Sequence, residues 1–286
     1  MKKILITGST GFIGSSLLLN LKDKYKLYLV LRKKNKKKLN LSKNHKIIYF
    51  KNYDHLNMQL KKIKADILIH CATHYVKKHN FNDISKIIKA NILFGNIILE
   101  NLSAMKVKKF INFSTVWENY NGKNGLSFNL YSAYKQSFRK IIDYYKIKNK
   151  NTKFYNIFIS DTYGENDKRK KLISSLRHSY FNNKIQILIS KKLYINLLNV
   201  KDILRAINLI VTKKIIPGNY ILKNTMDFNL FNIVLKINKK KNKKLKVKWM
   251  SSKIIKEKIY KYKTLSYWKP KFSNLDHLVN FITKNS

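Results

Sequence analysis

Short apolar runs alternate along the first 160 residues with segments in which apolar residues recur every three or four positions. A continuous run of about four to eight apolar residues is typical of a buried strand, and the longer period indicates an amphipathic helix. The predicted strands are residues 2–7, 27–31, 47–50, 66–70, 110–113 and 154–159. The predicted helices are residues 12–21, 55–62, 82–105 and 131–145.

This alternation of strands and helices predicts the fold class. Strands that are apolar on both faces are typical of a parallel sheet that is covered by helices on both sides. After residue 160 the pattern loosens, and it predicts helices at 171–181, 202–211, 233–238 and 275–283 and strands at 185–189 and 194–198. The sequence therefore indicates an α/β protein with a doubly wound parallel sheet and a smaller C-terminal lobe.

The charge of the chain is very high, with 61 Lys+Arg against 14 Asp+Glu and a formal net charge of +47. A basic surface of this size is a feature of proteins that bind nucleic acid. Only five of the basic residues are arginine, however, and arginine is the residue whose bidentate fork recognises phosphates and base edges. Apolar residues still make up 44%, enough for a sizeable core. We interpret the excess lysine as a solvated surface, and nucleic acid is not expected as a partner.

A glycine-rich turn joins the first predicted strand to the first predicted helix. It reads Thr7-Gly8-Ser9-Thr10-Gly11-Phe12-Ile13-Gly14 and holds three of the eight glycines in the chain. Glycine at this spacing allows a tight turn, a close approach of the backbone to a pyrophosphate, and close packing of the helix on the sheet. The turn therefore predicts a dinucleotide site formed by Thr7, Gly8, Thr10, Gly11, Phe12, Ile13 and Gly14.

This turn resembles the glycine loop of the extended short-chain dehydrogenase/reductase family, which contains nucleotide-sugar epimerases, dehydratases and reductases. The match covers every specified position of the family pattern TGxxGFIG. The resemblance implies a Rossmann fold in which residues 1–163 bind NAD(P) and residues 196–212 pack back onto that domain. Residues 164–286 are then expected to form the substrate-binding lobe.

The end of the second predicted strand bears on the choice between NADP and NAD. In NAD-dependent proteins an acidic residue there binds the 2′-hydroxyl of the adenine ribose. Here Arg32 and Lys33 follow the strand, with no carboxylate between Asp23 and Asp54. Two cations suit the 2′-phosphate of NADP, so we expect NADP, with NAD as the alternative. The resemblance adds Asp54, after the third strand, as a residue near the adenine.

The family's chemistry uses a tyrosine and, four residues later, a lysine, a spacing that puts both on one face of a helix. Four Tyr-x-x-x-Lys pairs occur in this lysine-rich chain, so the spacing alone selects none of them. Tyr131 and Lys135 lie in the string Leu130-Tyr131-Ser132-Ala133-Tyr134-Lys135-Gln136, which resembles the family's catalytic helix. The resemblance implies that Tyr131 transfers the proton. It also implies that Lys135 stabilises the ionised phenol and holds the nicotinamide ribose.

The resemblance also implies a hydroxyl at the end of the strand 110–113, which hydrogen-bonds the substrate oxygen as charge develops on it. The string Phe113-Ser114-Thr115-Val116-Trp117 offers two such groups. By distance from the strand we choose Thr115, and Ser114 stays as the alternative. Trp117 in the same string, together with Arg177 and His178 on the helix 171–181, is expected to contact the substrate.

The residues after Thr115 bear on the class of reaction. Sugar 4,6-dehydratases of the family place Asp-Glu there, whereas this chain has Val116 and Trp117, so dehydration is not expected. The Ser-Thr-x-Trp string is most similar to the branch that makes CDP-abequose and related deoxy sugars. This implies NADP-dependent reduction of a 4-keto-6-deoxy sugar carried by CDP or dTDP. The alternatives are an NAD-dependent nucleotide-sugar 4-epimerase and, third, a non-catalytic polyanion-binding protein.

Other kinds of site and partner are less marked in the sequence. The single cysteine, Cys71, excludes an intrachain disulfide and is interpreted as a small buried residue. His70, His74 and His79 are spaced too irregularly for us to expect a metal site. No apolar run is long enough for a membrane span and no signal-peptide pattern occurs, so a cytoplasmic location is expected. A homodimer is left open as the assembly.

Overall fold

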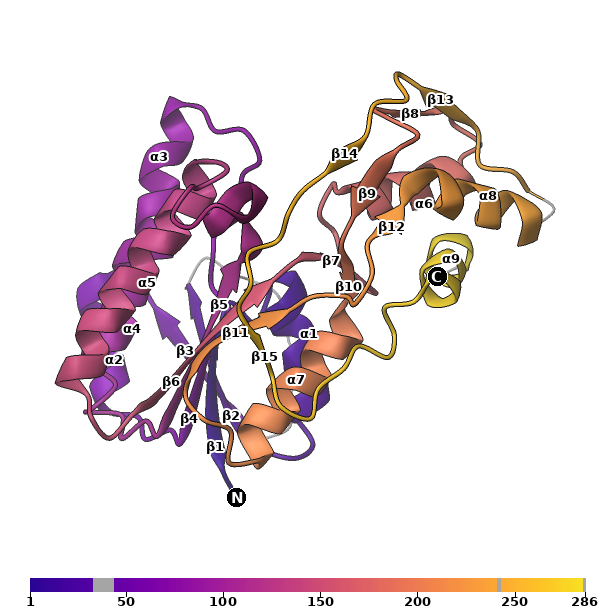
Figure 1. The fold of residues 1–286 in the computed structure, drawn as a ribbon. Helices are drawn as coiled ribbons and strands as arrows, with labels where there is room; N and C mark the ends of the chain where they lie inside the picture. Colours follow the sequence, from indigo (N-terminus) through magenta and orange to yellow (C-terminus); the bar gives the residue numbers. More distant parts are fainter. Residues whose placement is uncertain (33–43, 241–242, 285–286) are drawn as a thin grey trace. The chain divides into compact units, whose positions relative to one another are not determined.

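The computed structural model describes residues 1–32, 44–240 and 243–284 (Figure 1). The chain divides into two compact units, each assembled from three segments. The first unit comprises Met1–Phe158, Ile210–Ile221 and Tyr260–Lys263, and the second comprises Ile159–Leu209, Leu222–Ile259 and Thr264–Ser286. Each unit therefore depends on contacts between residues that are far apart in the sequence.

Among the described residues, the central sheet has eight strands in the order β15-β11-β6-β5-β4-β1-β2-β3. Neighbours along the run β5-β4-β1-β2-β3 pair in parallel. The strands are Lys3–Thr7 (β1), Lys26–Arg32 (β2), Lys46–Phe50 (β3), Ile67–His70 (β4), Lys109–Thr115 (β5), Lys153–Ile159 (β6), Gly218–Leu222 (β11) and Lys263–Thr264 (β15). The first six match the predicted strands, and the predicted doubly wound α/β class is confirmed.

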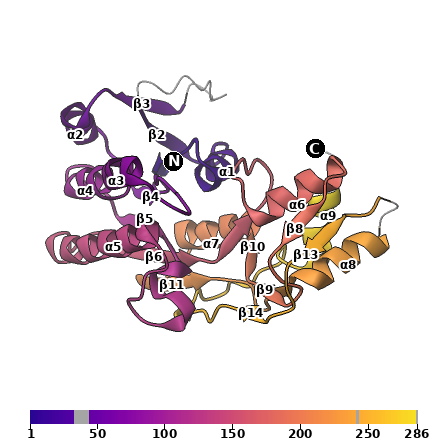
Figure 2. The same ribbon diagram turned by 90° about the horizontal axis from the view of Figure 1, so that it is seen from above.

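Helices cover both faces of this sheet (Figure 2). One face carries α2 (Tyr53–Lys61), α4 (Phe94–Glu100) and α5 (Leu130–Lys148), and the other face carries α1 (Phe12–Leu21), while α3 (Phe81–Ile88) extends beyond the strand ends. Their apolar faces bury the core of the first unit, because removing these side chains from water is the main favourable term in folding.

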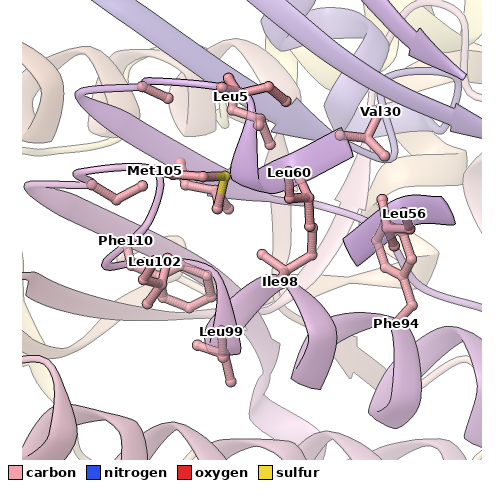
Figure 3. Packing of buried hydrophobic residues seen from close by; sticks show 14 of the residues in the cluster. Leu5, Val30, Leu56, Leu60, Phe94, Ile98, Leu99, Leu102, Met105 and Phe110 are labelled. Carbon is pink, nitrogen blue, oxygen red and sulfur yellow. The ribbon is translucent and has the colours of Figure 1, made fainter. Parts of the chain in front are cut away.

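The core between the sheet and helices α2, α4 and α5 is made of large aliphatic and aromatic side chains (Figure 3). Leu5 and Phe110 come from the strands, Leu60 from α2, and Ile98 and Leu99 from α4, and all five are fully buried. This packing fixes the carboxyl ends of β1, β4 and β5 on one rigid base, and those ends carry the candidate site.

The structure corrects the single helix predicted at residues 82–105. The segment consists of α3, a π-helical turn (Lys89–Leu93) and α4, and α4 ends at Glu100. Asn91, buried in the π-helical turn, accepts hydrogen bonds from Thr73 Oγ1 at 3.1 Å and His74 N at 2.7 Å. Its amide also donates to the His74 carbonyl at 3.1 Å. The π-helical turn thereby ties the helix to the loop that follows β4.

In the part of the chain that the structure describes, the second unit combines short strands with three helices and most of a fourth, whose residues 210–212 belong to the first unit. Its elements are Asp161–Tyr163 (β7), Leu172–Phe181 (α6), Gln186–Leu188 (β8), Leu193–Ile195 (β9), Leu197–Asn199 (β10), Val200–Thr212 (α7), Phe228–Asn229 (β12), Leu230–Lys240 (α8), Val247–Trp249 (β13), Ile255–Lys256 (β14) and Leu275–Thr283 (α9). The strand predicted at 194–198 is wrong as one element, because β9 pairs with β12 and β14 whereas β10 pairs with β7. Among the described residues, no helix combines the length and apolarity that crossing a membrane requires.

Asp202, in the first turn of α7, is the most highly connected buried carboxylate of the second unit. It is fully buried and accepts hydrogen bonds from Lys271 N at 2.7 Å, Phe272 N at 2.9 Å and Ser273 Oγ at 2.7 Å. Arg205 Nη1 lies 3.1 Å from the same carboxylate. These bonds tie residues 271–273 to the start of α7.

Asp202→Ala is expected to lower the free energy of unfolding by about 3 kcal/mol, because it leaves buried donors and a cation without their acceptor. Urea unfolding measures the change. Asp143→Ala is the control, because Asp143 pairs with Lys146 at the surface and such pairs contribute only about 0.5 kcal/mol. Equal losses in the two variants would contradict the structural role of Asp202.

Candidate active site

The glycine loop lies between the end of β1 and the start of α1. Gly8 has a φ of 68°, in the left-handed region, and a Cβ there would lie 2.6 Å from the Ala72 backbone nitrogen. A Cβ on Gly14 would overlap the carbonyl of Gly8. The backbone of the loop therefore packs directly against the strand end and the helix, and no side chain fits at either position.

This loop fits the pyrophosphate of NAD(P). Gly11 is the N-cap of α1 and, with no side chain, supplies no capping hydrogen bond. The first turn of a helix presents N–H groups without partners inside the helix, and together with the helix dipole they favour an anion. Thr7 is the last residue of β1, and its hydroxyl is buried 3.0 Å from His70 Nδ1. This contact ties the ends of β1 and β4 together.

The residues predicted to contact the adenine ribose follow adjacent strands. Arg32 is exposed at the carboxyl end of β2, and its register partner is Phe50 at the end of β3. Asp54 is exposed in the first turn of α2, which starts three residues after Phe50. Lys33 lies outside the described residues. At the carboxyl edge of the sheet, Arg32 thus ends the strand next to β1 and Asp54 follows the strand beyond it, and this fold class binds dinucleotides at that edge.

Tyr131 and Lys135 lie one helical turn apart in α5. The helix begins after Asn129, whose side chain accepts from Ser132 N at 2.9 Å while Ser132 Oγ accepts from Asn129 N at 3.0 Å. This capping box fixes the first turn, in which Tyr131 lies. Lys135 is buried and donates to the Phe113 carbonyl of β5 at 2.8 Å. Burial lowers the pKa of Lys135 to about 8.

The two candidate hydroxyls at the end of β5 have different surroundings. Ser114 is buried and donates a very short hydrogen bond to Glu118 Oε1. Thr115 Oγ1 accepts a hydrogen bond from Trp117 N at 3.3 Å, which leaves its own proton for another acceptor. This geometry supports the choice of Thr115 over Ser114 as the donor to a substrate oxygen.

Trp117 is connected to Tyr131 through a ring that the sequence did not single out. The ring centroid of Tyr75 lies 6.3 Å from that of Trp117 and 5.0 Å, edge to face, from that of Tyr131. Phe128 packs on Trp117 at 5.3 Å. Aromatic rings of this kind form a rigid, partly apolar surface next to a polar reaction centre. Tyr75 belongs to a loop, and no motif marked it.

Glu118 and Arg139 form a buried ion pair that was also missed. Glu118 is fully buried, and its Oε2 lies 2.9 Å from Arg139 Nε. Burial raises the pKa of Glu118 to about 7, against the opposing effect of Arg139. The only signal in the sequence was a rare carboxylate three residues after Thr115, in a chain with 14 acidic residues.

Arg177 and His178 lie on α6 in the second unit. Arg177 donates to the carbonyls of Phe281 at 3.1 Å and Lys284 at 2.9 Å, so it joins α6 to the end of α9. His178 is exposed and lies within 3.2 Å of the Asn182 side chain. Contact of either residue with a substrate stays a prediction.

The histidines after β4 have separate surroundings. His70 packs among the rings of Phe94, Phe110 and Phe138, and burial lowers its pKa to about 3. Desolvation raises the pKa of the adjacent Cys71 thiol to about 12, so the thiol is protonated at neutral pH. Within the described ranges, no three His, Cys, Asp or Glu side chains come together as a group that could hold a metal ion.

Comparison with known proteins identifies related sequences and structures. A model of the NAD dependent epimerase/dehydratase family matches residues 4–222. The chain is 28% identical over 211 residues to the CDP-abequose synthase of Yersinia pseudotuberculosis, and the match covers 73% of each chain. The family match therefore includes the glycine loop, the end of β5 and helix α5.

Solved structures share the fold over nearly the whole chain. A UDP-N-acetylglucosamine 4-epimerase from Methanobrevibacter ruminantium, in complex with UDP-N-acetylmuramic acid, superposes with a TM-score of 0.79 at 18% identity, covering 98% of this chain and 97% of the other. A UDP-glucuronic acid 4-epimerase from Bacillus cereus, in complex with UDP-glucuronic acid and NAD, gives 0.78 at 19% identity, covering 98% of each chain. At these identities the likeness shows the fold.

Proposed function

This chain belongs to the NAD-dependent epimerase/dehydratase family, and from that premise we propose that it reduces the 4-keto group of a 6-deoxy sugar carried by CDP or dTDP, with NADPH as reductant. Membership makes it an NAD(P)-dependent enzyme that modifies nucleotide sugars. The observation that carries the proposal is the buried Lys135 one helical turn after Tyr131, bonded to β5 two residues before Thr115. The similarity to a CDP-abequose synthase supports reduction.

The side chains of the first unit supply what the reduction requires of the protein. When bound, a reduced nicotinamide supplies the hydride for the carbonyl carbon. Tyr131 donates its phenolic proton to the carbonyl oxygen, so that the ketone becomes a secondary alcohol. Lys135 stabilises the phenolate that remains, and the Thr115 hydroxyl donates a hydrogen bond to the same oxygen as charge develops on it. Tyr131 then recovers a proton from solvent.

Dehydration has less support from this site. The carboxylate of Glu118 is the first acidic group after Thr115, and both of its oxygens are engaged, one by Ser114 and the other by Arg139. A fully buried carboxylate with two partners is not available to remove a proton from a sugar carbon. The surroundings of Glu118 therefore favour a reaction that needs only Thr115, Tyr131 and Lys135.

A 4-epimerase is the second candidate, because the same three side chains suffice for it. Epimerases remove a hydride from the sugar and return it to the other face, so they consume no reductant. NAD that stays bound through purification, together with interconversion of two nucleotide sugars without NADPH, would favour this alternative.

The test of the proposal is a turnover assay. Purified protein is incubated with CDP-4-keto-6-deoxyglucose or its dTDP counterpart and NADPH, and the loss of NADPH absorbance is followed. We expect one molecule of NADPH to be oxidised for each deoxy sugar formed, as measured by mass spectrometry. Absence of NADPH oxidation with both substrates would contradict the reductase assignment.

The preference for NADP depends on Arg32. Arg32→Ala is expected to raise KM for NADPH by about tenfold, because it removes a charge-assisted contact of about 1.4 kcal/mol with the 2′-phosphate. KM for NADH should change little, since NADH has a hydroxyl at that position. Lys46→Ala is the matched control: Lys46 is an exposed cation at the opposite, amino end of β3. An equal effect of Arg32→Ala on both cofactors would contradict the NADP assignment.

A further inference from the structure

Glu118 is a buried carboxylate that the proposed reaction does not use. Its side chain has no exposed surface, and its two oxygens have two different partners, the Ser114 hydroxyl and Arg139 Nε at 2.9 Å. Burying a carboxylate costs free energy unless hydrogen bonds and an opposite charge compensate, so the partners of a buried carboxylate must be held close to it. The partners of Glu118 are residues of the candidate site.

Both partners of Glu118 adjoin candidate catalytic residues. Ser114 directly precedes Thr115 on β5. Arg139 follows Lys135 by four residues on α5, the spacing at which Lys135 itself follows Tyr131, so the three side chains share one face of the helix. The carboxylate therefore bridges the strand end that carries Thr115 and the helix face that carries Tyr131 and Lys135.

The position of Arg139 is fixed by a second set of contacts. Its guanidinium lies 5.5 Å from the ring centroid of Phe158, and Phe158 stacks on Tyr262 with centroids 4.0 Å apart. The Tyr262 hydroxyl accepts a hydrogen bond at 2.8 Å from Asn119, the residue after Glu118. The network thus closes on itself, and movement of Glu118 would disturb both β5 and α5.

The charged groups around Glu118 are two cations, Arg139 and Lys135, which face this one carboxylate. Glu118 faces the cations of Arg139 and Lys135 on α5 and the Tyr262 phenol, and Lys135 also faces the Cys71 thiol and the His70 ring. Burial lowers the pKa of Lys135 while the charge of Glu118 raises it. Glu118 is the one carboxylate among these groups, so its negative charge opposes loss of the Lys135 proton.

We propose that Glu118 is a positioning residue of this active site: through Ser114 and Arg139 it fixes the end of β5 against α5, and its negative charge keeps Lys135 an ammonium ion. This inference rests on the proposed function, in which Lys135 must be charged and Thr115 must point at the substrate oxygen. Glu118 itself touches neither substrate nor cofactor in this role.

The two parts of the role predict different effects of two substitutions. Glu118→Gln keeps the shape but removes the charge. Two buried cations are then left without an anion, so the alkaline limb of the kcat/KM profile should move to lower pH by about one unit. Glu118→Asp keeps the charge but is shorter by one methylene. It should leave the limb in place and lower kcat about tenfold through misplacement of Thr115.

The measurement is the pH profile of NADPH oxidation at saturating cofactor, with thermal melting recorded for each variant. Asp202→Asn is the matched control, because Asp202 is equally buried and paired with an arginine but lies in the second unit. It should lower the melting temperature and leave the alkaline limb unchanged. A folded Glu118→Gln whose limb coincides with that of the unaltered protein would overturn the charge role.

Two further variants separate this inference from the proposed function. If Glu118→Gln does not fold, Glu118→Asp and Arg139→Lys decide, and unaltered kcat in both would overturn the positioning role. Tyr131→Phe tests the function itself. If it retains full activity, the reductase mechanism is wrong whatever Glu118 does. If it is inactive while every Glu118 variant behaves as the unaltered protein, only the inference about Glu118 fails.

Discussion

Tyr131→Phe is expected to lower kcat by about a thousandfold, the effect of losing a positioned general acid. The substitution removes one hydroxyl from the first turn of α5. It leaves the capping bonds between Asn129 and Ser132 and the packing of the ring against Tyr75 in place. The protein should therefore stay folded and still bind NADPH. Steady-state kinetics, with fluorescence titration of NADPH, measures both properties.

The chain provides its own matched control for this variant. Tyr144 is followed by Lys148 at the same spacing on the same helix, but its side chain is 60% exposed, and Lys148 bonds Glu100 at the surface. Tyr144→Phe should leave kcat unchanged. Comparable losses in both variants would mean that the loss reflects the helix, and would contradict a catalytic role for Tyr131.

The second large effect is expected at the glycine loop. Gly11→Ala adds a methyl group at the exposed N-cap of α1, 3.3 Å from the Gly8 carbonyl oxygen, a contact that the backbone tolerates with a small shift. In the cofactor site that we propose, the same methyl group would occupy the space of the pyrophosphate. NADPH binding is therefore expected to weaken by about ten- to a hundredfold, the effect of an overlap of about 1–3 kcal/mol.

Two neighbours on α1 distinguish binding from folding. Gly14→Ala places a methyl group into the Gly8 carbonyl and should lower the melting temperature whether or not NADPH is present. Ser16→Ala removes only a hydrogen bond to the Phe12 carbonyl and should bind NADPH normally. Normal NADPH affinity in a folded Gly11→Ala protein would contradict the location of the cofactor site.

Much of the first unit was predictable because its strands are solid apolar runs. Because these strands are buried on both faces, apolar and polar residues do not alternate along them and each strand is a continuous apolar run. Strands β1 to β6 therefore lie where the sequence predicted them. β11 was missed because it starts at Gly218-Asn219-Tyr220, a polar and turn-forming string. Its place in the sheet depends on long-range pairing, which the local pattern does not record.

Two predicted elements were wrong for reasons that also lie in tertiary contacts. The segment 82–105 contains a π-helical turn, in which the Asn91 side chain bonds the backbone of His74 outside the helix. The spacing of the apolar residues gives no sign of this turn. The strand at 194–198 is divided at Asn196. That side chain donates to the Asn224 carbonyl at 3.1 Å and to Asp227 at 2.9 Å.

The candidate site shows the same division between local and tertiary signals. The glycine loop and the string around Tyr131 and Lys135 carry local motifs, so the sequence indicated them. Glu118 and Arg139 are 21 residues apart. In a chain with 61 Lys and Arg residues, a carboxylate and a cation at that separation cannot be recognised as a pair from the sequence. Their importance depends on burial, which becomes visible only when β5 and α5 are packed together.

The position of Asp202 bears on how this protein folds during synthesis. Its hydrogen-bond donors are residues 271–273, about 70 residues later in the chain. The first unit has the same dependence, because Tyr262 stacks on Phe158. N-terminal regions emerge from the ribosome first, yet neither unit can make these contacts until residues 260–273 have left the exit tunnel. We therefore expect nascent chains stalled before residue 260 to remain sensitive to protease, although the cofactor motifs have already been made.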